Sequence, residues 1–109
     1  MEGKFIMVRI SCAGQEEAAG IAEALLKKRL IACANISAPY DSAYWWKGKL
    51  ERSREVFLIA KTKLSMFAAV SVEIKRLHSY RIPEIVAIPI SAGDEEYLRW
   101  LEDSISEGG

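Results

Sequence analysis

The chain has 109 residues, the usual size of one domain; half are apolar and 28% are charged. Fifteen acidic and fifteen basic side chains cancel, so no overall field draws the protein to nucleic acid or to an anionic membrane, and we expect neither partner. No apolar run approaches the roughly 20 residues that span a bilayer, and no signal-peptide pattern opens the chain. Two cysteines match neither a disulfide framework nor a zinc site. We therefore expect one domain over residues 1–109, without membrane insertion, in a reducing cytoplasm.

The first third of the chain predicts a strand, a helix and a second strand. Residues 5–10 are a short apolar run before a turn, which is typical of a buried strand. From Gln15 onward, apolar residues recur at helical spacing until a basic segment at residues 27–29, which suits the negative end of a helix dipole. Gly20 lies inside this helix at a cost of about 1 kcal/mol relative to alanine, so we expect a close packing contact there. Residues 30–36 return to a strand pattern.

A long hairpin follows. Its expected arms are residues 42–46 and 50–60, with the reversal at Lys47-Gly48. The arms exceed what one small sheet usually requires, since strands most often run five or six residues. The outer half is polar and the inner half apolar, so we expect only the base to be buried within the subunit. The tip, with Trp45 and Trp46, is expected to pack against another protein surface.

The remainder predicts a helix, a strand and a short last helix. Thr62 or Ser65 is a candidate cap for the first of these helices, and Asp94 for the last. Residues 84–90 are the expected fourth strand, and residues 106–109 should fray. The order is β-α-β-β-α-β with an added C-terminal helix. This predicts an α+β fold, a ferredoxin-like split β-α-β sandwich with both principal helices on one face of the sheet.

Several functions that this fold supports have local signatures, which the sequence lacks. A soft-metal chaperone would carry C-x-x-C after the first strand, where Cys12 stands alone, and an acylphosphatase-like enzyme would hold an arginine in that loop. The aromatic and basic strand motifs of an RNA-recognition module are also missing. The single histidine, His78, has no local partner that would orient it as a catalytic base. We therefore expect no enzymatic activity.

Four blocks of residues carry a family resemblance. They are Ser-Cys-Ala-Gly-Gln-Glu at 11–16, Tyr-Trp-Trp-Lys-Gly-Lys-Leu at 44–50, Leu-His-Ser-Tyr-Arg-Ile-Pro-Glu at 77–84 and Tyr-Leu-Arg-Trp-Leu at 97–101. In order and spacing the chain resembles the CutA family of divalent-cation-tolerance proteins. The resemblance implies a homotrimer in which the long hairpin packs against neighbouring subunits. It also implies a part in tolerance to copper and other divalent cations.

The same resemblance implies metal ligands at Cys12 and His78. Two ligands from one chain make a weak site unless another group adds to them, and Glu84 is our candidate for a third ligand. A thiolate and an imidazole suit copper better than Mg²⁺ or Ca²⁺, which prefer oxygen. Some members have a second histidine where this chain has Leu77, and Ser79 replaces a proline, so a copper or other divalent-cation site here would be weak. Alternatives stay open at this point: Cys12 as a small buried side chain, and His78 as a polar helix terminus.

A second hypothesis is a trimeric module for small-ligand binding, signalling or anchoring, without metal chemistry. In that case a cleft between subunits accepts a small ligand or an unknown partner protein. The side chains expected to line it are Tyr44, Trp45, Trp46, Lys61 and Tyr80, together with Glu84. Aromatic residues are also enriched at protein–protein interfaces, so the residues alone do not choose between a pocket and an interface.

Overall fold

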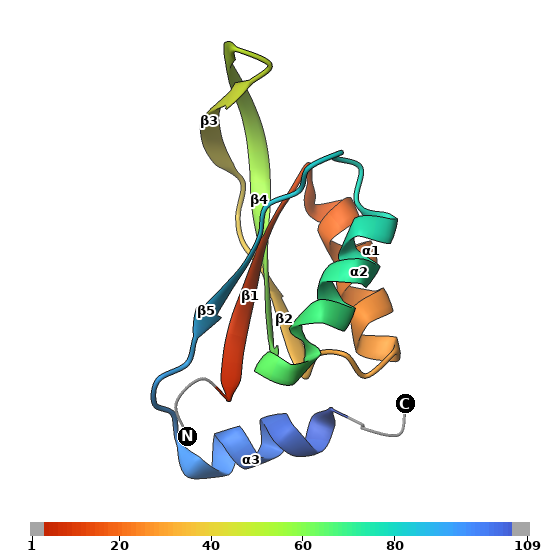
Figure 1. Cartoon of the computed structure of the whole chain (residues 1–109), viewed down its shortest axis with the longest axis vertical. Coiled ribbons are helices and arrows are strands. Elements are labelled where there is room, and N and C mark those ends of the chain that lie inside the picture. Colours follow the sequence, from red (N-terminus) through yellow and green to blue (C-terminus); the bar gives the residue numbers. More distant parts are fainter. Residues whose placement is uncertain (1–3, 106–109) are drawn as a thin grey trace.

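The computed structural model describes residues 4–105, so the expected fraying of residues 106–109 lies outside it. The elements follow one another in an order that confirms the α+β fold (Figure 1). They are β1 (Phe5–Cys12), α1 (Gln15–Lys27), β2 (Cys33–Ile36), β3 (Tyr40–Trp46), β4 (Lys49–Lys63), a 3₁₀ turn (Leu64–Met66), α2 (Phe67–Leu77), β5 (Ile85–Pro89) and α3 (Glu95–Ser104). None of the described helices combines the length and the hydropathy needed to cross a membrane.

The sheet is antiparallel, with strand order β2-β4-β1-β5. Its central strand β4 is long enough to belong to two pairings: the inner half pairs with β1 and β2, and the outer half pairs with β3. The pairing with β1 ends where Cys12 faces Val56, and the pairing with β3 begins one residue further along, at Glu55. The end of β1 therefore lies at the base of the hairpin.

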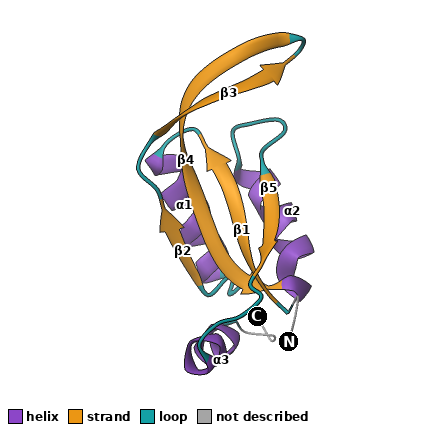
Figure 2. Ribbon diagram, turned by 90° about the vertical axis from the view of Figure 1, so that its left-hand side faces the viewer, coloured by secondary structure: helices purple, strands orange, loops and turns teal. Residues whose placement is uncertain are grey.

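The core lies between one face of the sheet and helices α1 and α2, which cover that face (Figure 2). Alternate residues of β1, namely Ile6, Val8, Ile10 and Cys12, are buried in it, as expected for a strand with one face covered. Full burial of an aliphatic side chain contributes roughly 1.5–3 kcal/mol. Helix α3 lies across one end of the sheet, where Leu101 and Ile105 pack on Phe5.

The second strand starts three residues later than predicted. Arg29 adopts a left-handed backbone with φ of 60°, and its N–H donates to the Leu26 carbonyl at 3.0 Å. The N–H of Leu30 donates to the Leu25 carbonyl, also at 3.0 Å. These two bonds form a Schellman motif, which satisfies the last carbonyls of α1 and keeps Leu30 out of the strand.

Two other local predictions are wrong. Strand β4 continues to Lys63, so Thr62 is a buried strand residue whose hydroxyl donates to the Leu30 carbonyl at 2.7 Å. Neither Thr62 nor Ser65 caps α2, because its N-cap is Met66, without a side-chain bond.

A β-carbon on Gly20 would have no heavy atom within 4 Å, so no close contact explains this glycine. Asp94 is confirmed as the N-cap of α3, accepting from the Tyr97 N–H at 3.0 Å.

The hairpin turns through two residues with positive φ, 52° at Lys47 and 77° at Gly48. This is the combination that a two-residue type I′ turn requires. The arms project beyond the body of the molecule, whose longest extent is 45 Å (Figure 1). At the tip, Trp45 leaves 74% of its surface exposed.

Candidate functional site

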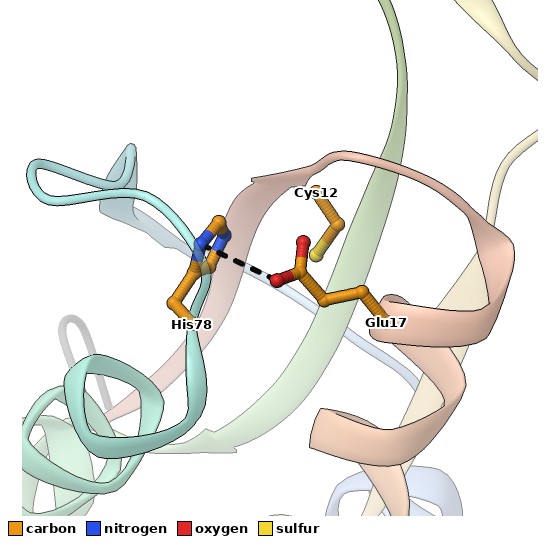
Figure 3. Close-up of side chains that lie close together, drawn as sticks. All are labelled: Cys12, Glu17 and His78. Atoms are coloured by element: carbon orange, nitrogen blue, oxygen red, sulfur yellow. Dashed lines mark ion pairs between the residues drawn. The ribbon is translucent and has the colours of Figure 1, made fainter.

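Three potential metal donors converge where β1 ends. Cys12 is the last residue of β1, Glu17 lies in the first turn of α1, and His78 follows the last residue of α2. The sulfur, a carboxylate oxygen and a ring nitrogen all lie within 4.8 Å of one another. In Figure 3 the carboxylate of Glu17 reaches back from α1 toward the other two side chains. The consecutive elements β1 and α1, together with the distant loop after α2, thus supply one cluster.

Both ring nitrogens of His78 are already engaged. Its Nε2 lies 2.7 Å from the Ser11 carbonyl oxygen, and its Nδ1 accepts from the Tyr80 backbone N–H at 3.0 Å. Because Nδ1 accepts, Nε2 carries the proton and donates to Ser11. The side chain is fully buried. The structure therefore contains a neutral imidazole that joins the end of β1 to the loop after α2.

The carboxylate of Glu17 has two backbone donors. One oxygen accepts from the Ala13 N–H at 2.9 Å and the other from the Ser79 N–H at 2.7 Å. Its Oε2 also lies 3.8 Å from Nδ1 of His78. Burial opposes ionisation, yet the hydrogen bonds from Ser79 and Ala13 outweigh it and hold the pKa of Glu17 below its ordinary value. A negative charge is thus present beside the histidine and the cysteine.

Cys12 is fully buried. Burial, followed by the charges of Glu17 and Glu55, raises the pKa of its thiol to about 12, so the sulfur is protonated at neutral pH. Thiolate, imidazole and carboxylate together suit a soft or borderline cation such as copper or zinc. The donor types therefore fit such an ion, and its entry would displace the thiol proton and one hydrogen bond of the imidazole.

A second feature adjoins this cluster. A cavity of about 830 Å³ extends along the hairpin from its base, where it adjoins the end of β1 and the loop before β5. Of the residues expected to line a cleft, it is lined by Tyr44, Trp45, Trp46, Tyr80 and Glu84. Lys61 is not among its lining residues. Its ammonium lies 5.6 Å from the ring centre of Tyr97 on α3.

Comparisons with known proteins identify the family. The profile of the CutA1 divalent ion tolerance protein family matches residues 6–104. The chain belongs to this family. The divalent-cation tolerance protein CutA of Archaeoglobus fulgidus is 44% identical over 98 residues, which cover 90% of this chain and 95% of that protein. Its namesake in Thermus thermophilus is 41% identical over the same shares.

Solved structures agree with the sequence comparisons. The periplasmic divalent cation tolerance protein CutA from Archaeoglobus fulgidus superposes with a TM-score of 0.90 at 42% identity, over 94% of this chain and 99% of that one. CutA1 from Oryza sativa superposes with a TM-score of 0.92 at 35% identity, over 97% of each chain. The CutA1 fold is therefore established for this chain, and the family name associates it with tolerance of divalent cations.

The CutA1 resemblance pointed to Cys12 and His78, which the structure brings together. Glu84, our candidate for a third ligand, lies outside their cluster. The carboxylate of Glu84 instead accepts from Arg9 and from the Ser11 hydroxyl, each at 2.9 Å. Glu17 takes the third position and was missed. Its spacing offered a signal, because a carboxylate in the first helical turn after a strand points back toward that strand's end.

Proposed function

We propose that this CutA1 family member binds copper, or another soft or borderline divalent cation, through Cys12, Glu17 and His78. The convergence of three donor atoms within 4.8 Å carries the proposal. The donor types support it, since sulfur and nitrogen ligands favour copper over Mg²⁺ or Ca²⁺. Cation tolerance would then rest on direct binding by this cluster.

The protons and hydrogen bonds at the cluster determine how tightly it should bind a metal ion and how that affinity should depend on pH. A bound ion replaces the proton on the Cys12 thiol, whose pKa burial raises to about 12, and releases the Tyr80 N–H from Nδ1 of His78. Both exchanges oppose binding, so we expect modest affinity. Because the thiol loses a proton, the affinity should rise with pH across the neutral range.

An anaerobic copper(II) titration followed by EPR tests this function. We expect Cys12→Ser combined with His78→Ala to abolish the wild-type copper signal and Glu17→Gln to weaken binding. Cys33→Ser is the matched control, because Cys33 is the other free cysteine and lies outside the cluster. Circular dichroism establishes that each variant is folded. Unchanged copper affinity in the folded double variant would refute the proposal.

We further propose that the protein acts as a homotrimer, without catalysis, in a reducing cytoplasm. The exposed hairpin tip, with Trp45 and Leu50, supports an assembly. The two free cysteines support a reducing compartment. Light scattering tests the assembly: we expect a particle of three times the 12.2 kDa chain mass, and a monodisperse monomer would contradict it.

A further inference from the structure

The cavity along the hairpin is lined by both aromatic and acidic side chains. Its aromatic side chains are Tyr40, Tyr44, Trp45, Trp46, Phe57 and Tyr80. Two of them, Tyr40 and Phe57, are stacked with ring centres 4.1 Å apart. The cavity also contains the carboxylates of Glu55 and Glu84. Aromatic faces and carboxylates share one preference, because both attract a positive charge.

Glu55 lies in this cavity without a cationic partner. It is only 6% exposed, and its Oε2 accepts from the Tyr80 hydroxyl at 2.6 Å. Within residues 4–105, no lysine, arginine or histidine lies within ion-pair distance of it. A buried carboxylate without a counter-charge is costly, so a positive charge placed in the cavity would be stabilised.

The other charges around the cavity do not offset Glu55. The charge of Glu84 is balanced by Arg9, whose guanidinium lies 2.9 Å away. Arg81 also lines the cavity, but it is exposed and forms no ion pair with any described residue. The pKa of the Tyr80 phenol is raised mainly by burial, and the hydrogen bond to Glu55 and the charge of Glu55 raise it further. The Tyr80 phenol is protonated at neutral pH and donates to that carboxylate.

We propose that this cavity binds a small organic ammonium ion, whose charge Glu55 neutralises and whose carbon groups pack on Tyr40, the strand partner of Glu55, and on Tyr80. A neutral ligand would leave the carboxylate of Glu55 uncompensated. A hard metal ion would require several oxygen ligands, whereas the cavity provides one carboxylate without a cationic partner, Glu55, and a set of aromatic rings. Ammonium groups enclosed by aromatic side chains are a recurrent solution to this problem. The site is distinct from the Cys12 cluster and shares none of its three donors.

Isothermal titration calorimetry on the full chain in its native assembly tests the proposal, with choline and its neutral isostere 3,3-dimethylbutan-1-ol as the two probes. EDTA in the buffer makes the result independent of metal binding at Cys12. We expect choline to bind at least about tenfold more tightly than the isostere, since only choline carries the charge. Equal binding of the two probes, or no saturable binding of choline, would overturn the proposal.

Two variants locate the site. Glu55→Gln keeps the size of the side chain and removes its charge, and we expect it to abolish choline binding. Glu51→Gln, on the same strand but outside the cavity, should bind choline as the wild type does. If Glu55→Gln dissociates the assembly while Glu51→Gln does not, a neighbouring subunit supplies the missing cation and the proposal fails.

Glycine betaine, a zwitterion, tests whether Arg81, which also lines the cavity, takes part in binding. If betaine binds as tightly as choline, or more tightly, Arg81 holds its carboxylate, and Arg81→Gln should reduce betaine affinity and leave choline affinity unchanged. If betaine binds more weakly than choline, the ligand class is limited to ions without a carboxylate. Either result supports an ammonium site, provided that Glu55→Gln removes it.

Discussion

The Nε2 atom of His78 lies 2.7 Å from the carbonyl oxygen of Ser11, across 67 positions of sequence. This bond ties the loop after α2 to the end of β1. The bond from the Ser79 N–H to Glu17, 2.7 Å long, ties the same loop to the first turn of α1. The residues that could bind a metal ion therefore also hold three elements together, and their structural role can be measured separately.

Replacing His78 with alanine should lower the free energy of unfolding by about 1–3 kcal/mol, because the buried Ser11 carbonyl loses its donor. Urea denaturation of the metal-free protein measures the change. Lys75→Ala is the control, since Lys75 is exposed on α2 and such substitutions usually stay within about 0.5 kcal/mol. Equal unfolding midpoints for the two variants would show that the hydrogen bond of His78 does not contribute to the stability of the fold.

Two glycine substitutions should have opposite effects. Gly20→Ala lies in the interior of α1, where the new methyl group meets nothing within 4 Å, so it should stabilise the fold by about 1 kcal/mol. Gly48→Ala has equally open surroundings, but φ there is +77°, and it should destabilise by about 1 kcal/mol. Thermal unfolding of both variants tests the pair, and a shift of the same sign in both would contradict the backbone argument.

Because of Glu73, the free energy of unfolding should depend on pH in the acid range. It is buried and accepts from Arg76 at 2.7 Å and from Lys28 at 3.1 Å. The bonds from Arg76 and then Lys28 lower its pKa from 4.5 to about 2. Because the folded pKa lies below the unfolded one, the contribution is complete above the ordinary carboxyl pKa and is lost as pH falls toward about 2.

The measurement is the urea midpoint of wild type and Glu73→Gln between neutral pH and about pH 2. We expect the wild type to be more stable at neutral pH and the difference to vanish in acid. Glu51→Gln, which removes an exposed hairpin carboxylate, should show little difference throughout. A Glu73→Gln deficit that persists unchanged at the acid end would rule out the ionic explanation.

Local patterns predicted most of the fold, and the errors arose where backbone hydrogen bonds override the apolar pattern. The hydroxyl of Thr62 suits a helix cap, but residues 5–12 extend the pairing of β4 as far as Lys63. The strand pattern at Leu30 was overridden by the left-handed turn at Arg29. In both cases the decisive bond joins groups that local periodicity does not relate.

Some residues of the candidate sites could likewise be predicted from the sequence, and others could not. Cys12 and His78 belong to motifs and could be identified from sequence. The role of Glu17 depends on Ser79, 62 positions away. Glu55 lies in a charged segment expected to be exposed, yet it is buried and accepts from Tyr80. Burial of a carboxylate depends on which loops fold over it, and no spacing rule contains that information.

The exposed hairpin tip leads to the last prediction, which concerns assembly. Trp45 and Val72 are large apolar residues with similar exposure, 74% and 70%, but Trp45 lies on the hairpin and Val72 on α2. If the hairpin packs on neighbouring subunits, Trp45→Ser removes an aromatic anchor of the kind that contributes about 2 kcal/mol or more to an interface. Val72→Ser should leave the interface intact.

Light scattering over a dilution series distinguishes the two variants. We expect Trp45→Ser to dissociate at concentrations where the wild type and Val72→Ser keep three times the chain mass. Circular dichroism should be the same for all three proteins, because Trp45 is exposed in the subunit and adds little to its core. Equal masses for Trp45→Ser and Val72→Ser at every dilution would place the interface elsewhere, whereas dissociation of Val72→Ser alone would place it on α2.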